Sequence, residues 1–309
     1  RGTSGSGPTP SDREAGDGTT PNGRGSTGRG QTSRGTGREA QLDRSGLRPG
    51  WTTGACAAAA GRAAWTALLT GVFPDPVEID LPHGRRPAFA LTQEQLGEGW
   101  TMAAVTKDAG DDPDVTQGAV VRATLRRGEP GSGIVFRAGE GVGAVTRAGL
   151  PLAIGEPAIN PVPRHYIAAN IAAADREAGG SGEPDVLVTV SIDDGETIAR
   201  RTWNPRIGIL GGLSVLGTTG VVVPYSCAAW IASIHEGIDV ARATGVQHAA
   251  GTTGSSSTAT VERLYPGIEL LDMGDFAGAV LKYLHGHPIA RITLCGGFAK
   301  MSKLANGYL

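Results

Sequence analysis

Four aspartates within seven positions form the first group of residues in this sequence that could do chemistry. The segment KDAGDDPDVTQG, residues 107–118, holds Asp108, Asp111, Asp112 and Asp114. Crowded carboxylates repel one another, which raises the proton affinity of one of them and makes it a useful proton acceptor. We therefore predict that Asp108 and Asp111 are catalytic. The alternative is a series of turns, because Asp side chains often bond their own backbone, and the spacing of a calcium-binding EF-hand is absent.

The densest ligand-binding signal is the glycine-rich segment NPRIGILGGLSVLGTTG, residues 204–220. Glycines let a backbone approach a ligand closely, and threonine hydroxyls suit a ribose or a carboxylate. Gly212→Val should then weaken cofactor binding far more than it lowers stability. The spacing is neither GxGxxG nor that of a phosphate-binding P-loop, so a tight turn that needs positive φ is an equal alternative. The predicted cofactor-binding residues are Gly208, Gly211, Gly212, Gly217, Thr218, Thr219 and Gly220.

A third segment, GEGVGAVTRAGLPLAIGEPAINPVPR, residues 139–164, combines several prolines with closely spaced glycines. Such a sequence fixes an unusual backbone path that ends at Arg164 and His165. A guanidinium on a fixed loop suits carboxylate recognition, so we predict that Arg164 binds substrate. The alternative is a rigid linker, and His165 is a further candidate as a base or cobalt ligand.

The elements that must position these residues begin with an α+β region. Thr52 or Thr53 can cap a helix over the Ala-rich stretch 55–69, which ends at Gly71. The apolar runs VLVTVSI and ETIARRTW flank Asp194-Gly195, where Gly supplies the positive φ of a tight turn, so we predict a β-hairpin. We place the end of an N-terminal domain, 47–203, directly after it. Strands are expected at 77–81, 101–106, 119–125, 133–137, 186–192 and 196–203.

The second half alternates apolar runs with helical patterns, which favours βα units and a mostly parallel sheet. Pro224 and a capping Ser226 precede the clearest helix, at about 227–242. We predict a C-terminal α/β domain, 204–309, whose last helix runs to Leu309 and which lacks a further C-terminal segment. The fold class is α/β with two domains. The expected apolar stripe of this helix contains Trp230, Ile231, Ile234, Ile238 and Ala241. Further βα units are expected, with apolar runs at 267–272 and 288–295 and helices at 275–285 and 298–308.

Composition separates residues 1–46 from the rest. They hold 12 Gly, no aromatic residue and only three apolar side chains, so they cannot bury enough surface to offset ordering entropy, and we predict a disordered, dispensable tail. The tail carries seven Arg and five acids, which leaves 21 basic and 25 acidic residues in the remainder. A net acidic globular part argues against nucleic acid as a partner.

Other segments argue against further classes of protein. No apolar run approaches the length of a membrane span, and no secretory signal is evident, so we expect no membrane partner and a cytoplasmic location. Cys56, Cys227 and Cys295 are an odd count without a CxxC pair, which argues against a disulfide framework and against a cysteine metal site.

Four blocks, taken in order, resemble the signature blocks of the CbiD family of cobalt-precorrin-5B C1-methyltransferases. They are LRPGWTTGACAAAAGRAA (47–64), the Asp-rich loop, the segment 139–164 and TWNPRIGILGGLSVLGTTGVVVPYS (202–226). The resemblance implies an N-terminal α+β domain similar to the ribosomal protein S5 domain 2-like fold and a Rossmann-like C-terminal domain. It also implies transfer of a methyl group from S-adenosylmethionine to C1 of cobalt-precorrin-5B, giving cobalt-precorrin-6A in anaerobic cobalamin biosynthesis. Gln117 departs from the His that we expect there in many relatives.

The implied substrate carries many carboxylates, so a net acidic protein must gather cations at the cleft. Arg48, Arg164 and Arg206 each border a family block and are the expected contacts, with Thr52 and Thr53 of the first block. Cobalt enters only as part of the substrate, so no protein metal ligand is expected. The cofactor should lie at the C-terminal ends of the second domain's strands, with the corrin between the domains.

Two other functions stay open at this point. One is a nicotinamide-dependent tetrapyrrole reductase, although the sequence lacks GxGxxG and the acidic ribose ligand that follows it. The other is a non-catalytic corrinoid-binding carrier with a degenerate cofactor site.

Overall fold

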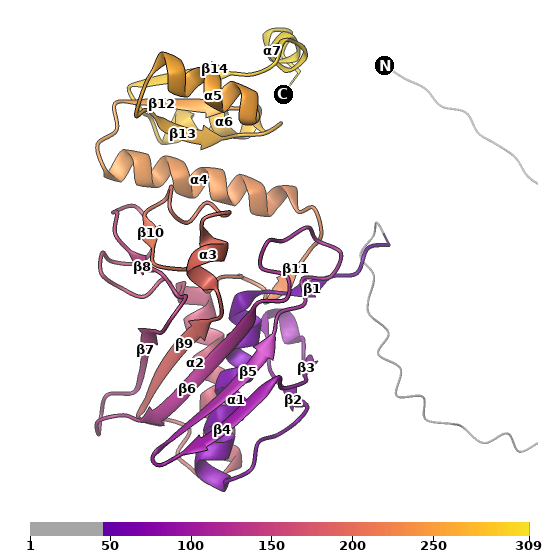
Figure 1. The fold of residues 1–309 in the computed structure, drawn as a ribbon, viewed down its shortest axis with the longest axis vertical. Coiled ribbons are helices and arrows are strands. Elements are labelled where there is room, and N and C mark those ends of the chain that lie inside the picture. Colours follow the sequence, from indigo (N-terminus) through magenta and orange to yellow (C-terminus); the bar gives the residue numbers. More distant parts are fainter. Residues whose placement is uncertain (1–45, 309) are drawn as a thin grey trace, which may run out of the picture. The chain divides into compact units, whose positions relative to one another are not determined.

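A computed structural model describes residues 46–308, which belong to one unit. The predicted disordered tail therefore lies outside the described residues, apart from Gly46. The fold is mixed α/β, with one five-stranded and one three-stranded sheet (Figure 1). None of the described helices combines the length and apolar character needed to cross a membrane.

The five-stranded sheet has the order β4-β5-β6-β9-β7. Its strands are β4 (Gln93–Gly97), β5 (Trp100–Thr106), β6 (Val120–Arg127), β7 (Ile134–Ala138) and β9 (Val186–Ile192). Every pairing is antiparallel except that of β7 with β9. Burial alternates strictly along β9, so one face of the sheet enters the core, as period-two patterning requires. The strands predicted at 101–106, 119–125, 133–137 and 186–192 are confirmed.

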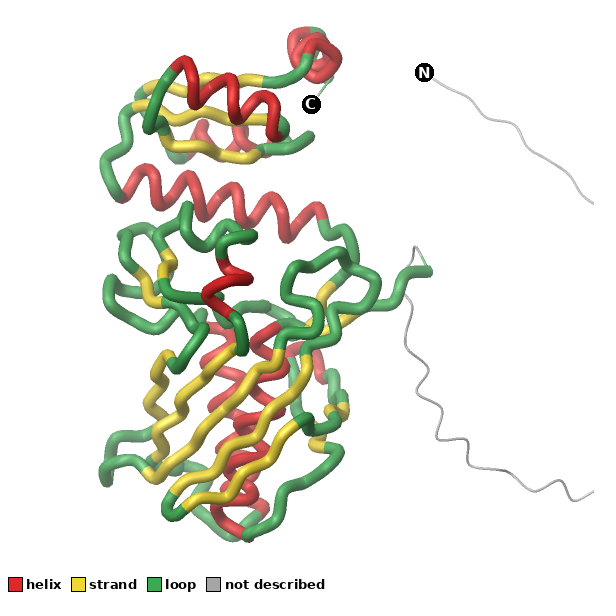
Figure 2. The backbone as a smooth tube through the Cα atoms, viewed as in Figure 1, coloured by secondary structure: helices red, strands yellow, loops and turns green. Residues whose placement is uncertain are grey.

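Two helices, α1 (Thr53–Thr70) and α2 (Pro161–Glu177), cover the buried face of this sheet (Figures 1 and 2). Residues 55–60 of α1 are wholly inaccessible to solvent. Their small side chains bring the α1 backbone close to both the sheet and α2. The helix begins at the predicted cap, where Thr52 accepts a hydrogen bond from Ala55 N, and ends at Gly71, whose φ is 80°. The predicted first helix is confirmed.

The predicted hairpin at 186–203 is wrong. The chain turns at Asp194 as expected, but residues Gly195–Ala199 form a short helix, α3, in place of a second strand. Strand β9 is already paired with β6 along one edge and with β7 along the other. No edge is left for a following strand, so the apolar residues after Gly195 are used in a helix.

Small pairings surround the main sheet. Strand β2 (Val77–Glu78) pairs with β3 (Ala88–Phe89), and a short 3₁₀ helix, η1 (Pro82–Gly84), lies between them. The strand predicted at 77–81 is therefore shorter than expected.

Two more pairings connect distant parts of the chain. Strand β1 (Gly50–Trp51) pairs with β11 (Val221–Val222), and β8 (Ala144–Val145) pairs with β10 (Ile209–Leu210), both antiparallel. Strands of the N-terminal half thus hold the predicted ligand-binding segment 204–220 at residues 209–210 and directly after its last residue.

The three-stranded sheet is wholly parallel, with the order β13-β12-β14. Its strands are β12 (His248–Thr252), β13 (Glu269–Asp272) and β14 (Arg291–Cys295), and they alternate with helices α5 (Ser255–Leu264), α6 (Ala277–Gly286) and α7 (Phe298–Ala305). The predicted βα alternation and parallel sheet are confirmed. This sheet has its own small core, separate from that of the five-stranded sheet.

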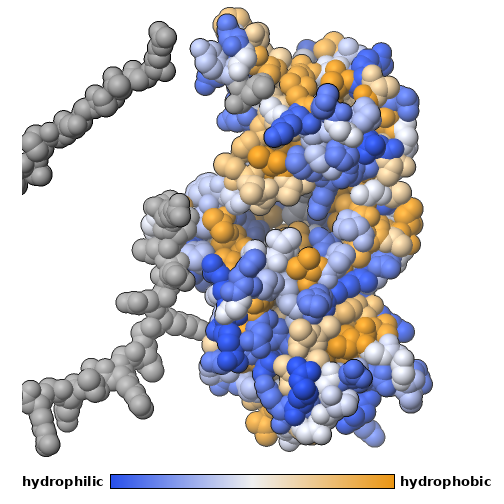
Figure 3. All heavy atoms as spheres, turned by 180° about the vertical axis from the view of Figure 1, so that it is seen from behind, coloured by the Kyte–Doolittle hydropathy of each residue, from blue (hydrophilic) through white to orange (hydrophobic). Residues whose placement is uncertain are grey.

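The predicted central helix is confirmed as α4 (Cys227–Ala243), capped by Ser226. Its residues Ile234 and Ile238 enter the core of the three-stranded sheet. Trp230, which the helical stripe also placed inside, is 43% exposed. On another face of the same helix, Val240 packs with Ile207 and Ile209. Figure 3 shows that hydrophobic and hydrophilic patches alternate over the face of the molecule seen from behind.

Candidate functional site

Three segments that are far apart in sequence lie together near the N-terminus of α1. The pairing of β1 with β11 is continued by hydrogen bonds from Trp51 N to Asp108 O (2.7 Å) and from Thr52 N to Gly220 O (3.0 Å). The Asp112 carboxylate accepts a bond from Tyr225 N at 2.8 Å. The structure therefore brings the first family-like block, the Asp-rich loop and the end of the glycine-rich segment into one place.

The predicted catalytic aspartates are both bound to Arg48. The Arg48 guanidinium donates to the two oxygens of Asp108 at 2.5 and 2.9 Å, and the Arg48 backbone N–H donates to Asp111 at 2.7 Å. The hydrogen bonds from Arg48 hold the pKa of Asp108 below its ordinary value. The expectation that crowding raises the proton affinity of this carboxyl is therefore wrong, because a cation stands beside it.

Asp114 makes the second ion pair of this loop. Its partner Lys107 is only 2% exposed, and their N···O distance is 2.7 Å. Burial alone would raise the pKa of Asp114, but Lys107 and hydrogen bonds from Thr116 outweigh it and the pKa is lowered. Gln117 accepts a bond from Ala109 N at 2.5 Å and so closes the same loop. Hydrogen bonding within the loop supports the turn alternative for Asp114.

The glycines of segment 204–220 have structural reasons to be glycine. Gly208, Gly211, Gly217 and Gly220 have positive φ. A Cβ on Gly212 would lie 2.3 Å from the backbone of Gly141. A valine side chain has no room at this position, so Gly212→Val should also lower stability, and its effect on cofactor binding stays a prediction. The glycine content by itself supports the turn alternative, and cofactor contacts by these residues stay a prediction.

The threonines of the site differ in what they bind. Thr52 caps α1, and a Cβ on Gly217 would collide with its side chain. The Thr53 hydroxyl donates to Ser214 O and accepts from Leu216 N. Both side chains are buried, so they hold the glycine-rich segment against α1. Thr218 is exposed, and the Thr219 hydroxyl accepts a bond from Val221 N at 3.3 Å.

The arginines predicted to bind carboxylates occupy different surroundings. Arg164 donates to Ile159 O at 2.7 Å, and also to the Glu156 carboxylate and Pro157 O. Its contacts fasten its own loop, which supports the linker alternative. Arg206 is exposed, and its guanidinium stands over the Trp203 ring, 5.9 Å from the centroid. His165 is exposed on α2.

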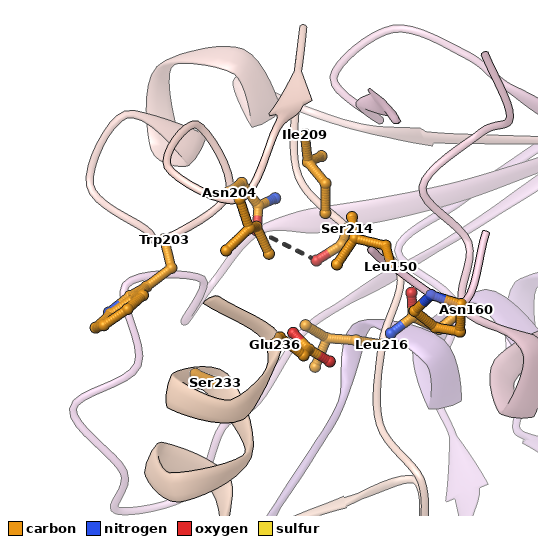
Figure 4. Close-up of a pocket in the computed structure, with 11 residues that line it drawn as sticks. Leu150, Asn160, Trp203, Asn204, Ile209, Ser214, Leu216, Ser233 and Glu236 are labelled. Carbon is orange, nitrogen blue, oxygen red and sulfur yellow. Dashed lines mark hydrogen bonds between the residues drawn. The ribbon is translucent and has the colours of Figure 1, made fainter. Parts of the chain in front are cut away.

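A pocket of about 60 Å³ opens between segment 203–216 and the face of α4 that carries Val240 (Figure 4). Its apolar walls include Trp203 and Leu216. The Ser214 hydroxyl donates to Asn204 Oδ1, and the Asn204 side-chain amide donates to Gly212 O, which fixes the wall of the pocket. The pocket is lined by Leu150, Pro151, Asn160, Trp203, Asn204, Ile207, Ile209, Ser214, Leu216, Ser233 and Glu236.

Glu236 on α4 is the acidic residue of this pocket. Burial, and next the charge of Asp239, raises the pKa of Glu236 above its ordinary value. The apolar stripe predicted for this helix did not include Glu236. The signal that could have found it is Val240, one turn further on, which indicates that α4 has a second apolar face.

No group of three His, Cys, Asp or Glu side chains within residues 46–308 is arranged to hold a metal ion. An α/β scaffold with a pocket that carries a carboxylate is the arrangement of a protein that binds a small molecule.

Comparison with known proteins gives the family. The CbiD family model matches residues 40–224. The cobalt-precorrin-5B C(1)-methyltransferase of Paramagnetospirillum magneticum is 61% identical over 86% of this chain and 75% of its own length. The protein of the same name from Agrobacterium fabrum is 59% identical over 87% of this chain and 71% of its own length. This chain belongs to the CbiD family.

One solved structure is also similar. The cobalamin biosynthesis protein (cbiD) from Archaeoglobus fulgidus is 28% identical, with a TM-score of 0.46, over 84% of this chain and 80% of that chain.

Proposed function

We propose that this chain is an S-adenosylmethionine-dependent methyltransferase that methylates C1 of cobalt-precorrin-5B, giving cobalt-precorrin-6A in anaerobic cobalamin biosynthesis. The observation that carries the proposal is the 61% identity, over 86% of the chain, to a relative that bears the name of this activity.

The division into two domains is part of the same proposal. The five-stranded sheet with α1 and α2 on one face is the candidate for the S5 domain 2-like part. The parallel sheet β13-β12-β14 with its intervening helices is the candidate for the Rossmann-like part. Separate buried clusters in the two parts support this division.

Arg48 is the cation best placed to meet a carboxylate of the corrin substrate. Its side chain is 41% exposed, and Asp108, its present partner, is also partly exposed. A substrate carboxylate would compete with Asp108 for the same two N–H groups, in the paired geometry that arginine and carboxylates share. Arg206 is the second such cation, since its guanidinium is exposed beside Trp203.

Methyl transfer from a sulfonium requires the carbon nucleophile, the methyl group and the sulfur to be nearly in line. Orientation of this kind contributes roughly 7–11 kcal/mol in well-placed reactions, whereas a general base adds about 10²–10⁴-fold in rate. Asp108 has a lowered pKa and is therefore a weak base. We assign to Asp108 the task of holding Arg48, and proton acceptance by Asp108 or Asp111 stays a prediction.

The direct test is incubation of the purified protein with S-adenosylmethionine and cobalt-precorrin-5B, followed by mass spectrometry of the corrinoid. A mass gain of one methyl group, dependent on S-adenosylmethionine, is expected. Equilibrium binding of S-adenosylhomocysteine and of NADPH separates the proposal from a nicotinamide-dependent reductase. Binding of NADPH without S-adenosylhomocysteine would contradict the proposal.

A further inference from the structure

Tyr225, directly before the N-cap of α4, is an aromatic residue that the fold leaves on the surface. It is 68% exposed, and among residues 46–308 no other aromatic ring stacks on it. A hydrophobic residue directly before a helix cap often packs against the fourth residue of the helix, which here is Trp230. The Trp230 indole N–H instead donates to Asp272 O, at the end of β13, at 3.3 Å. Trp230 is thus held by a different element, and the Tyr225 ring stays on the surface.

The backbone of Tyr225 has a conformation that tyrosine rarely adopts. Its φ is 54°, in the left-handed region, which is unfavourable for a residue with a bulky side chain. The Asp112 carboxylate holds this conformation by accepting a bond from Tyr225 N at 2.8 Å. Backbone strain of this kind persists where the position of a side chain matters, and it clusters at binding sites. Strain and exposure together indicate that the ring has a use outside the fold.

The residues on either side of Tyr225 extend it into an apolar surface. Val223 is 48% exposed, and all of residues 227–230, the first turn of α4, are exposed as well. Apart from the cap Ser226 and the buried Pro224, segment 223–230 therefore presents apolar side chains to solvent. A continuous exposed apolar surface is typical of a face that binds a ligand.

A cation stands beside this apolar surface. Asp111 accepts a bond from Arg48 N at 2.7 Å, and the next residue, Asp112, accepts the bond from Tyr225 N. Arg48 and Tyr225 are therefore held by consecutive residues of the Asp-rich loop. An apolar face next to a guanidinium matches a macrocycle whose faces are apolar and conjugated and whose rim carries carboxylates.

We propose that the Tyr225 ring stacks on the face of the corrin macrocycle while Arg48 binds a carboxylate at its rim, so that Tyr225 positions the substrate. The inference rests on the proposed function, because the substrate is taken from there. Stacking needs only the face of the phenol ring, since conjugated ring systems are bound through their π-faces. Tyr225 has no part in proton transfer or in binding the methyl donor.

The test is the binding of cobalt-precorrin-5B in the absence of methyl donor, measured by titration calorimetry. Tyr225→Asn removes the ring but keeps a residue type that tolerates positive φ, and it should weaken the substrate roughly 10-fold. Tyr225→Phe keeps the ring and should bind as the wild type does. Neither change should alter the affinity for S-adenosylhomocysteine. The control is Tyr308→Asn, the same change at a tyrosine that is 75% exposed, which should leave both affinities unchanged.

Thermal unfolding of the ligand-free variants distinguishes a substrate contact from a structural role. Because asparagine adopts a φ near 54° at lower cost than tyrosine, Tyr225→Asn should keep or raise the melting temperature. A tyrosine that stabilises the fold by packing would give a lower melting temperature. Asp112→Ala removes the acceptor that fixes Tyr225, and it should weaken cobalt-precorrin-5B by less than Tyr225→Asn does, because the ring is still present.

The outcomes separate this inference from the proposed function. If Tyr225→Asn binds cobalt-precorrin-5B as tightly as the wild type does, or if Tyr225→Phe loses as much affinity as Tyr225→Asn, stacking by Tyr225 is wrong. A marked drop in the melting temperature of Tyr225→Asn would also contradict it. A wild-type protein that neither binds nor methylates cobalt-precorrin-5B would instead refute the methyltransferase proposal on which this inference rests.

Discussion

The five-stranded and three-stranded sheets, each packed against helices, differ greatly in how far they and their helices are buried. Helix α1 is buried along nearly its whole length, from Thr53 to Ala67. Helix α7 has no buried residue, and Phe298 at its start is 91% exposed. Strand β9 buries every second residue, whereas β14 has none that is fully buried. Because stability follows apolar burial, the first region should carry most of the folding free energy and the second should open more easily.

The largest expected effect comes from the core under the five-stranded sheet. Trp65 is 1% exposed, and its indole N–H donates to Asp175 at 3.2 Å. Trp65→Ala should cost about 3–5 kcal/mol in the free energy of unfolding, measured by denaturant titration. Phe298→Ala, the control in the second region, should change it by less than about 0.5 kcal/mol. Equal losses would show that α7 contributes to the fold as α1 does.

The buried ion pair beside the Asp-rich loop should give the next largest effect. Asp114→Asn leaves Lys107, which is 2% exposed, without its anionic partner, and should cost roughly 3 kcal/mol. The lowered pKa of Asp114 has a defined consequence for pH. The ion pair contributes to the free energy of unfolding at pH values above the pKa that this carboxyl has in the unfolded chain. This contribution is lost as the pH falls through the pKa of Asp114 in the folded protein.

Acid titration of stability checks this directly. Wild-type stability should fall toward low pH more steeply than that of Asp114→Asn, and the two should converge in acid. Parallel curves would mean that Asp114 is not paired in solution.

A matched pair of glycines sharpens the comparison at backbone level. A Cβ at Gly212 would lie 2.3 Å from Gly141, whereas one at Gly297 would meet nothing within 4 Å. Gly212→Ala should cost about 1–3 kcal/mol, the range for overpacking. Gly297→Ala should fall within about 0.5 kcal/mol of the wild type. Thermal melts of both variants measure the difference. Similar melting temperatures would contradict the explanation that residue 212 is glycine because it packs closely against Gly141.

The smallest effect is expected at the helix caps. Thr52 and Ser226 accept equivalent bonds, each 3.2 Å long, from Ala55 N and Ala229 N. Ser226→Ala should cost about 1 kcal/mol. Thr52→Ala should cost more, because the buried Thr52 side chain also packs against Gly217. The reverse order in denaturant titrations would show that the exposed cap matters more than the buried one.

Local patterns in the sequence were sufficient for much of the fold. The caps Thr52 and Ser226, the stop at Gly71 and the alternation along 186–192 depend on neighbours a few residues away, and each is found as predicted. The parallel sheet also follows from the sequence, because alternating apolar runs and helical patterns leave few other arrangements. Four ordered blocks were likewise enough to indicate the CbiD family, to which the chain belongs.

Only the tertiary structure decided which side chains are left available to a ligand. The sequence shows Arg48, Asp108 and Arg164 as charged residues but does not show their partners. Arg48 pairs with Asp108, which is 60 residues away, and Arg164 pairs with Glu156 in the loop that leads to α2. The sequence also predicted a strand after Asp194, where both edges of β9 were already occupied. Glu236 became visible as a pocket residue only once α4 lay against segment 203–216. Charge, pKa and free hydrogen-bonding capacity depend on what surrounds a group in space, and that is set by contacts between residues that no local pattern connects.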